Sequence, residues 1–266
     1  MKSSSNSEPL TFGGHLEVLR RMMFRILIVV GLIAVIIFCF KDLTWQILLA
    51  PSECDFLTYR LIERILASLT ASDFRFDEYF VELIATDLSS QFMTHITTSI
   101  YLGVLFASPY ILYELFRFAS PALYENERKY SVRLIVTVYF LFIIGVLMSY
   151  FVIFPISFRF LGTYSVAERV RSTITLDSYV STFTVLTLVM GMVFQLPVIS
   201  FALTKFGLIT SEILANYRKH SFIAIMFISA IITPPDIMTL IFVSLPLYVL
   251  YEVSIRVSRI CEHHVN

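Results

Sequence analysis

Long apolar runs alternate with shorter polar segments along most of the chain. Four of these runs have roughly the 20 residues that an α-helix needs to cross a hydrocarbon core of about 30 Å. Two shorter runs follow near the carboxyl end, on either side of the sequence TPPD at 233–236. The pattern predicts six membrane-spanning helices, over residues 22–40, 96–115, 134–154, 179–203, 221–232 and 237–253.

The last two predicted spans are short. The fifth is apolar for only about a dozen residues, which cover about 18 Å at the helical rise of 1.5 Å per residue. Local thinning of the bilayer, or a polar face lined by protein, is expected beside such a helix. Prolines occur within or next to the apolar runs, and we expect them to bend packed helices rather than to mark a site. They are Pro109, Pro155, Pro197 and Pro246.

Composition supports a membrane protein. Hydrophobic residues make up 57% of the chain and charged residues 15%, with a mean hydropathy of +0.79. These values are typical of a polytopic membrane bundle rather than a soluble domain. We therefore expect an all-α fold with a single membrane domain over residues 1–266, a cytoplasmic amino-terminal segment 1–21 and a carboxyl-terminal tail 256–266. The formal net charge of zero gives no reason to expect nucleic acid as a partner.

The distribution of Lys and Arg predicts the orientation. With six spans, the termini share one side with the loops around 116–133 and 204–220, and this side holds 13 of the 20 basic residues. The other side holds the remaining 7 in longer segments that are also rich in acids. Because cytoplasmic loops carry an excess of Lys and Arg, both termini are expected in the cytoplasm.

Sequence motifs for catalysis or metal binding were sought and not found. The chain has no phosphate-binding G-x-x-x-x-G-K-[ST], no H-E-x-x-H among its 5 histidines and no G-x-S-x-G. Its cysteines, Cys39, Cys54 and Cys261, fall in different compartments of the predicted topology, so no disulfide is expected. We expect neither an enzyme nor a bound cofactor or metal. An intramembrane hydrolase remains a rival that lacks a recognisable nucleophile and base.

Three polar residues lie at costly positions in or beside the spans. Gln195 is inside the fourth span, where an amide either hydrogen-bonds within the chain or faces a partner helix or cavity. Glu114 lies near the cytoplasmic end of the second span and either reaches water at the interface or lines a path. Asp236 either caps the start of the sixth helix or takes part in a site.

Carboxylates gather at the predicted cytoplasmic face. Glu17 precedes the first span, and Glu125 and Glu127 follow the second. Carboxylates bind guanidinium groups through paired hydrogen bonds, so the three acids suit a ligand with neighbouring arginines. The alternative is that Glu125 and Glu127 only pair with the basic residues of the same loop, in particular Arg128.

Several segments resemble the TatC family, the large polytopic subunits of twin-arginine protein translocases. The similar segments occur in the family's order and spacing and extend from about residue 15 to residue 259. They are HLEVLRR at 15–21, SPYILYELFRFASPALYENERK at 108–129, FVIFPISFRFL at 151–161, GMVFQLPV at 191–198 and TPPD at 233–236. Each segment alone is a weak signal, and the set is specific.

The resemblance implies a fold and a function. It implies six transmembrane helices in a concave, glove-like bundle in the bacterial inner membrane, an organellar membrane being the alternative. Such proteins receive the twin-arginine signal peptides of folded proteins, assemble with small single-span subunits of the TatA and TatB type in an oligomeric complex within membrane lipid, and use the proton motive force. By position, the resemblance assigns peptide recognition to Leu19, Arg20, Phe118, Pro121, Leu123, Tyr124, Glu127 and Arg128.

The remaining site residues follow from the same resemblance. Glu127 is the expected arginine acceptor, with Glu17 or Glu125 assisting. Gln195 stands where the family keeps a polar residue in the membrane, which implies a contact with a partner helix. Structural or assembly roles are expected for Pro197, Pro234, Pro235 and Asp236.

The chain also departs from the family pattern. The family acid of the amino-terminal segment is replaced by Val18, and the nearest acid, Glu17, is rotated by about 100° on a helix. Thr239 and Leu240 replace a Ser-Gln pair after TPPD, and the external segment 41–95 is longer than usual. A proton-coupled transporter of a small solute, with Gln195, Glu114 and Asp236 along its path, is the alternative function, although the two halves of the chain show no internal repeat.

Overall fold

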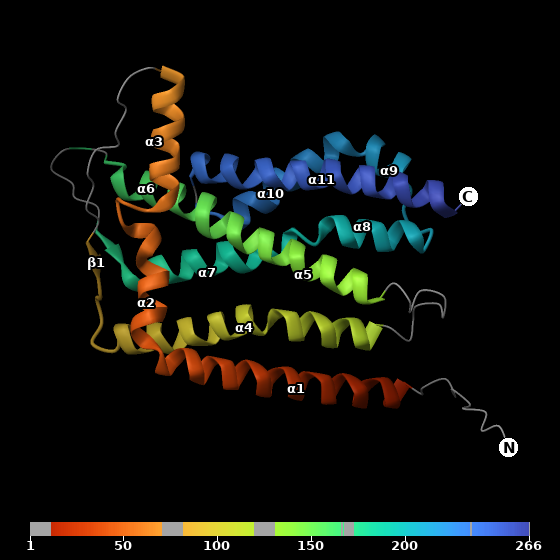
Figure 1. Cartoon of the computed structure of the whole chain (residues 1–266), viewed down its shortest axis with the longest axis horizontal. Helices are drawn as coiled ribbons and strands as arrows, with labels where there is room; N and C mark the ends of the chain where they lie inside the picture. The colour runs from red at the N-terminus through yellow and green to blue at the C-terminus, as the bar shows by residue number, and fades with distance from the viewer. Residues whose placement is uncertain are drawn as a thin grey trace. The chain divides into compact units, whose positions relative to one another are not determined.

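The structure, a computed structural model, describes residues 12–70, 82–119, 131–165, 167, 173–234 and 236–265, and most of them are helical (Figure 1). The elements are α1 Phe12–Cys39, α2 Lys41–Leu49, the 3₁₀-helix η1 Ala50–Ser52, α3 Leu57–Thr70, β1 Leu83–Ile84, α4 Ser90–Ala119, α5 Ser131–Met148, the π-helix η4 Ser149–Ile153, α6 Phe154–Thr163, β2 Ile174–Thr175, α7 Leu176–Val193, α8 Leu196–Lys205, α9 Ser211–Asn216, α10 Arg218–Ile232 and α11 Ile237–Val265. The two short strands pair in parallel, Leu83 with Ile174 and Ile84 with Thr175.

The all-α membrane fold expected from the sequence is confirmed. Five helical segments are long and apolar enough to cross a membrane: Leu16–Cys39, Ser90–Leu115, Ile135–Thr163, Leu176–Lys205 and Ile237–Glu262. The expected fifth span lies on α10, whose 15 residues extend for about 22 Å. This length is short of the hydrocarbon core, as the sequence predicted.

The last helix is longer than the span predicted on it. The sequence indicated a short apolar helix over 237–253 and a tail from 256, whereas α11 has 29 residues and continues to Val265. Its carboxyl-terminal half is held by small polar contacts with α8, including a 2.6 Å hydrogen bond between the hydroxyls of Thr204 and Ser258. Such contacts leave no mark in a hydropathy pattern, so the end of the apolar run was not the end of the helix.

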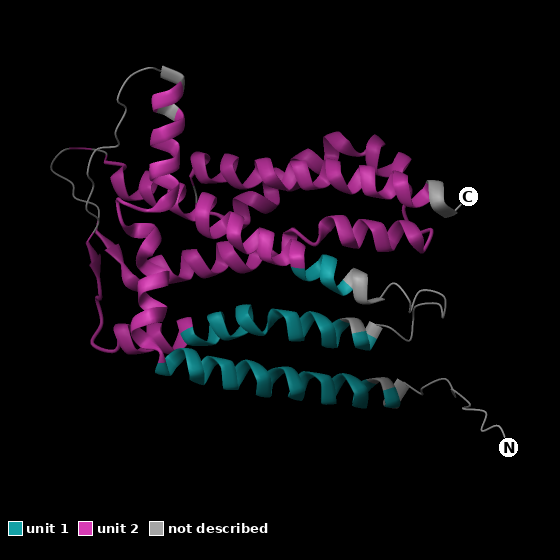
Figure 2. Cartoon of the chain, in the orientation of Figure 1, with its two compact units in different colours: residues 1–39, 99–139 teal, residues 40–98, 140–266 magenta. Residues whose placement is uncertain are grey.

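The structure divides into two compact units (Figure 2). Unit 1 comprises residues 1–39 and 99–139, and unit 2 comprises residues 40–98 and 140–266. In unit 1, α1 approaches α4 closely at Gly103, where an added Cβ would lie 3.0 Å from the Cβ of Ala34. A small residue at such a crossing lets two helix backbones pack tightly in a membrane.

The core of unit 2 is aromatic and lies around α6 and α7. The ring of Phe154 meets those of Tyr179 and Phe183 edge-on, each with centroids 5.0 Å apart. Because the phenol of the buried Tyr179 needs a polar partner, its hydroxyl donates a 2.8 Å hydrogen bond to the carbonyl of Leu48 at the end of α2. The segment after α1 is thereby attached to the membrane-spanning part of unit 2.

Prolines divide two of the apolar segments into separate helices, as the sequence indicated. The third segment changes from α5 to the π-helix η4 and then to α6, with Pro155 in the first turn of α6. The fourth changes from α7 to α8 at Phe194 and Gln195, with Pro197 in the first turn of α8. Proline has no N–H to donate and its ring excludes the preceding turn, so helices restart at these positions.

Within unit 2, α7 and the part of α5 from Phe140 onward cross at two glycines. A Cβ on Gly145 would lie 2.6 Å from the carbonyl oxygen of Met190, and a Cβ on Gly191 would lie 2.6 Å from the ring of Phe142. Real Cβ atoms do not approach so closely, so the crossing depends on the absence of a side chain at both positions.

Replacing Gly145 with alanine is therefore expected to destabilise the protein by about 1–3 kcal/mol, because the two backbones must separate. The matched control is Gly31→Ala on α1, where nothing lies within 4 Å of an added Cβ. There, alanine should be neutral or stabilising by up to about 1 kcal/mol through its higher helix propensity. Unfolding of both variants in detergent tests this pair, and equal midpoints would contradict the role of the crossing.

Candidate functional site

The residues predicted to read the signal peptide fall into two groups. Glu17, Leu19 and Arg20 lie on α1, and Phe118 lies in the last turn of α4, all in unit 1. The loop members of the set lie outside the residues that the structure describes. These are Pro121, Leu123, Tyr124, Glu125, Glu127 and Arg128.

Glu17 is exposed and already has a basic neighbour. Its carboxylate accepts a hydrogen bond from Nη2 of Arg21, one helical turn later, over 2.5 Å. The two side chains are 51% and 71% exposed. A pair of this kind at i and i+4 contributes about 0.3–0.5 kcal/mol, so Arg21 can be exchanged for another guanidinium at small cost.

Glu114, by contrast, does not reach water. Its side chain is only 3% exposed and forms an ion pair of 3.4 Å with Arg25 of α1, which is 44% exposed. The hydroxyl of Tyr110 donates to the same carboxylate over 3.1 Å. Arg25 also donates from Nε to the carbonyl of Arg21 over 3.4 Å. These contacts connect α1 and α4 at the ends of both spans.

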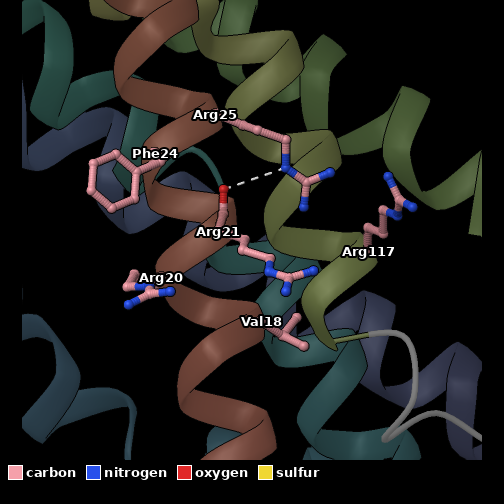
Figure 3. A pocket seen from close by; sticks show the side chains of 6 residues that line it. All are labelled: Val18, Arg20, Arg21, Phe24, Arg25 and Arg117. Atoms are coloured by element: carbon pink, nitrogen blue, oxygen red, sulfur yellow. Dashed lines mark hydrogen bonds between the residues drawn. The ribbon is translucent and has the colours of Figure 1, made fainter.

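An open pocket of about 650 Å³ lies in the same part of unit 1 (Figure 3). Arg21 and Arg25 extend from α1 toward α4, which carries Arg117. The lining residues are Val18, Arg20, Arg21, Phe24, Arg25 and Arg117. The predicted site residue Arg20 therefore belongs to a strongly basic surface, which Val18 lines as well.

Gln195 lies at the junction of α7 and α8 in unit 2. Its backbone carbonyl accepts the hydrogen bonds that begin α8, from Val198 and Ile199, each over 3.0 Å. Its side-chain Nε2 donates to the carbonyl of Gly191 over 3.3 Å. The intrachain hydrogen bond considered from the sequence is thus present, and the neighbouring Pro197 is buried.

Asp236 caps the last helix, as its position before an apolar run suggested. Its Oδ1 accepts a 2.6 Å hydrogen bond from the backbone N–H of Thr239, and its own N–H donates to the carbonyl of Pro234 over 2.7 Å. Pro235 lies outside the described residues. Within the part of the chain that is described, Oδ2 of Asp236 and Oγ1 of Thr239 are buried without a hydrogen-bond partner.

The described residues contain no cluster of three or more His, Cys, Asp or Glu side chains that could hold a metal ion. The polar chemistry found in them consists instead of ion pairs, caps and hydrogen bonds between helices. Together with the apolar helices, these features define a multi-pass helical membrane protein.

Comparison with known proteins identifies the family within this class. The family model for the Sec-independent protein translocase protein TatC matches residues 14–246. The chain belongs to the TatC family.

Individual relatives agree with this assignment over most of their length. The TatC protein of Blattabacterium sp. subsp. Periplaneta americana is 34% identical over 97% of both chains. That of Carboxydothermus hydrogenoformans is 30% identical over 95% of this chain and 94% of the relative. A crystal structure described as the twin-arginine translocase receptor TatC superimposes with a TM-score of 0.72 at 30% identity, covering 93% of this chain and 99% of the other.

Sequence reasoning did not find the ion pair between Arg25 and Glu114. From the sequence, Glu114 was expected either to reach water at the interface or to line a path. A signal was nevertheless present, because opposite charges near the same end of two adjacent spans are expected to pair in a low-dielectric surrounding. Which helix faces are adjacent is not contained in a hydropathy pattern.

We expect this pair to show strong coupling in a double-mutant cycle. Arg25→Gln leaves a buried carboxylate without its cation and should cost about 1–3 kcal/mol, reduced from a fully buried pair because Arg25 is partly exposed. Glu114→Gln removes the buried charge and keeps an acceptor for Tyr110, so its cost should be smaller. The double variant should be less destabilised than the sum of the single variants, by about 1 kcal/mol, in detergent unfolding. Additive changes would show that the pair contributes no coupling.

Proposed function

We propose that this chain is the receptor subunit that recognises twin-arginine signal peptides of folded proteins in a bacterial inner membrane. The observation that carries the proposal is the likeness, over 93% of the chain, to a solved protein described as the twin-arginine translocase receptor. The chain also carries the sequence SPALYENERK at 120–129, which resembles the family's first cytoplasmic loop. In this role the chain binds and positions its ligand.

The distribution of carboxylates supports Glu127 as the main arginine acceptor. In the described part of unit 1, the acids are Glu17 and Glu114. Glu114 is buried and paired with Arg25, and losing that pair would leave a buried ion without compensation. Glu17 is paired with Arg21 and has further arginines nearby. A peptide with two arginines therefore needs a carboxylate beyond these two, and Glu127 stands at the matching loop position.

Glu17 and Glu125 are proposed as assisting acids. The exposed pair of Glu17 with Arg21 is weak, so a peptide guanidinium can take the place of Arg21 at a cost of about 0.5 kcal/mol or less. Leu19, Arg20, Phe118, Pro121, Leu123, Tyr124 and Arg128 are proposed to complete the recognition surface. The apolar part of the signal peptide would then enter the concave face of the bundle.

Assembly with partners extends the proposal to unit 2. We place small single-span subunits of the TatA and TatB type against the region of Gln195 and the helix cap at Asp236. The resemblance assigns a partner-helix contact to Gln195 and a structural or assembly role to Asp236, and both residues belong to unit 2. The complex is oligomeric, has both termini of this chain in the cytoplasm and uses the proton motive force.

Mutation of the loop acid tests recognition directly. Photocrosslinking of a twin-arginine signal peptide in membranes should fall by about tenfold in Glu127→Ala, the loss of about 1.4 kcal/mol of binding. Glu17→Ala and Glu125→Ala should reduce it less, and the larger of these two effects identifies the acid that substitutes for the one missing at Val18. A twin-lysine peptide should crosslink weakly to every variant, because an ammonium group does not form the paired contacts of a guanidinium.

The matched control is Glu212→Ala, which removes an exposed acid in the first turn of α9. It should leave crosslinking unchanged. If the twin-arginine and twin-lysine peptides crosslinked equally to the wild type and to all variants, the loop would not recognise arginines. The receptor assignment would then fail.

A second variant separates the proposed partner contact of Gln195 from its intrachain hydrogen bond. Gln195→Leu should lower co-purification of the small subunits about fivefold while shifting the unfolding midpoint little, since an interhelical hydrogen bond in a membrane contributes about 1 kcal/mol. Gln46→Leu, at an exposed position of α2, serves as the control. A large loss of stability with unchanged co-purification would assign Gln195 a structural role only.

A further inference from the structure

The pocket of unit 1 combines four arginines with exposed apolar side chains. Phe24 is 60% exposed and Val18 is also exposed at its rim. Two of the four guanidinium groups have carboxylate partners, Arg21 with Glu17 and Arg25 with Glu114. Within the described residues, the side chains of Arg20 and Arg117 have no ion pair or hydrogen-bonded partner, so the described lining carries two positive charges that no described carboxylate balances.

The position of these charges along the helices is that of a membrane interface. The apolar span of α1 begins at Leu16 and that of α4 ends at Leu115, two residues before Arg117. Only 11% of the α1 span window is buried within the protein, so most of this helix is accessible to surrounding lipid or to another helix. The pocket therefore lies at the ends of two spans, where lipid headgroups meet the protein surface.

We infer that this pocket binds the phosphate of an anionic phospholipid. Basic pockets between transmembrane helices are suited to such headgroups. Arginine contributes a planar fork of N–H donors that binds two phosphate oxygens at once. Arg117 from α4 and Arg21 from α1 approach the phosphate from two helices, while the acyl chains follow Phe24 along the lipid-facing side of α1.

Arg25 has a distinct part in this site. Its guanidinium is held by the buried Glu114 and by the carbonyl of Arg21, and these two contacts do not use all five of its N–H donors. A guanidinium that is already ordered loses little conformational entropy when it binds a ligand. The buried acid therefore positions one cation of the pocket in advance, whereas Arg117 remains exposed and adaptable.

A lipid explains the pocket better than a free anion. Val18 and Phe24 of α1 present exposed apolar surface that inorganic phosphate cannot use. The inference does not depend on the proposed receptor function, since it concerns arginines of unit 1 and a component of the membrane.

The test measures retention of dioleoylphosphatidylglycerol by the full chain in native mass spectrometry after purification in detergent. Wild type should retain this lipid in preference to dioleoylphosphatidylcholine. Arg117→Gln should bind it about fivefold more weakly, because each basic residue near an anionic headgroup contributes about 1 kcal/mol. The matched control is Arg256→Gln, which removes an exposed arginine of α11 and should leave retention unchanged. Thermal unfolding confirms that both variants remain folded.

A measurement on the wild type alone gives a second readout if Arg117→Gln is poorly folded. Raising the salt concentration should reduce phosphatidylglycerol retention, because exposed guanidinium–phosphate contacts are screened, and should leave phosphatidylcholine unaffected. Equal retention of the two lipids, equal weakening in both arginine variants, or full displacement by inorganic phosphate at the lipid's own concentration would overturn the inference. Displacement of that kind would identify a site for free phosphate.

Discussion

The fold depends on supplying hydrogen-bond partners for backbone groups that prolines leave free inside the membrane-spanning part of the chain. Pro155 cannot donate to the carbonyl of Phe151 four residues earlier, and in hydrocarbon an unpaired carbonyl costs several kcal/mol. The hydroxyl of Thr58 donates to that carbonyl, and Tyr59 donates to the carbonyl of Pro155 itself over 2.8 Å. The helix break in unit 2 and the start of α3 are therefore parts of one hydrogen-bonded structure. The hydroxyls of Thr58 and Tyr59 therefore have two effects: they supply hydrogen bonds to the carbonyls at the break, and they attach the segment between α1 and α4 to unit 2.

This constraint explains what could and could not be predicted from the sequence. Apolar length alone identifies membrane helices, because a bilayer requires about 20 apolar residues irrespective of the rest of the fold, and four long spans were found in this way. The prolines were expected to bend packed helices, and helices restart at Pro155 and Pro197. Pro109 and Pro246 instead lie inside the continuous helices α4 and α11. The helices α2 and α3, by contrast, are held by partners about 100 residues away, such as the carbonyl of Pro155 for Tyr59. When only its own residues are considered, a segment with such distant partners is interpreted as a loop.

In the candidate site, too, a feature that depends on nearby residues could be predicted, and a feature that depends on a distant helix could not. A helix cap was one of the two roles considered for Asp236, because a cap depends on residues within one turn, and the structure contains that hydrogen bond from Thr239. The environment of Glu114 was not predicted, because it depends on Arg25 of another helix. Residue types and family spacing still point to Glu127, which lies outside the described residues. Its role therefore rests on the resemblance and on the pairing of the other two acids of unit 1.

Charge at the end of α1 connects the proposed receptor function with the inferred lipid site. A surface with excess positive charge repels an arginine-bearing peptide over a distance of about 8 Å at physiological ionic strength. A bound anionic phospholipid would neutralise Arg117 and Arg21, and Glu17 would then have less competition for its carboxylate from cations of its own chain. Peptide binding and lipid binding would in that case favour each other, and by thermodynamic linkage each would raise the affinity for the other by the same factor. Val18 adds no carboxylate to the lining of this pocket, so a positive charge remains there that a lipid phosphate would balance.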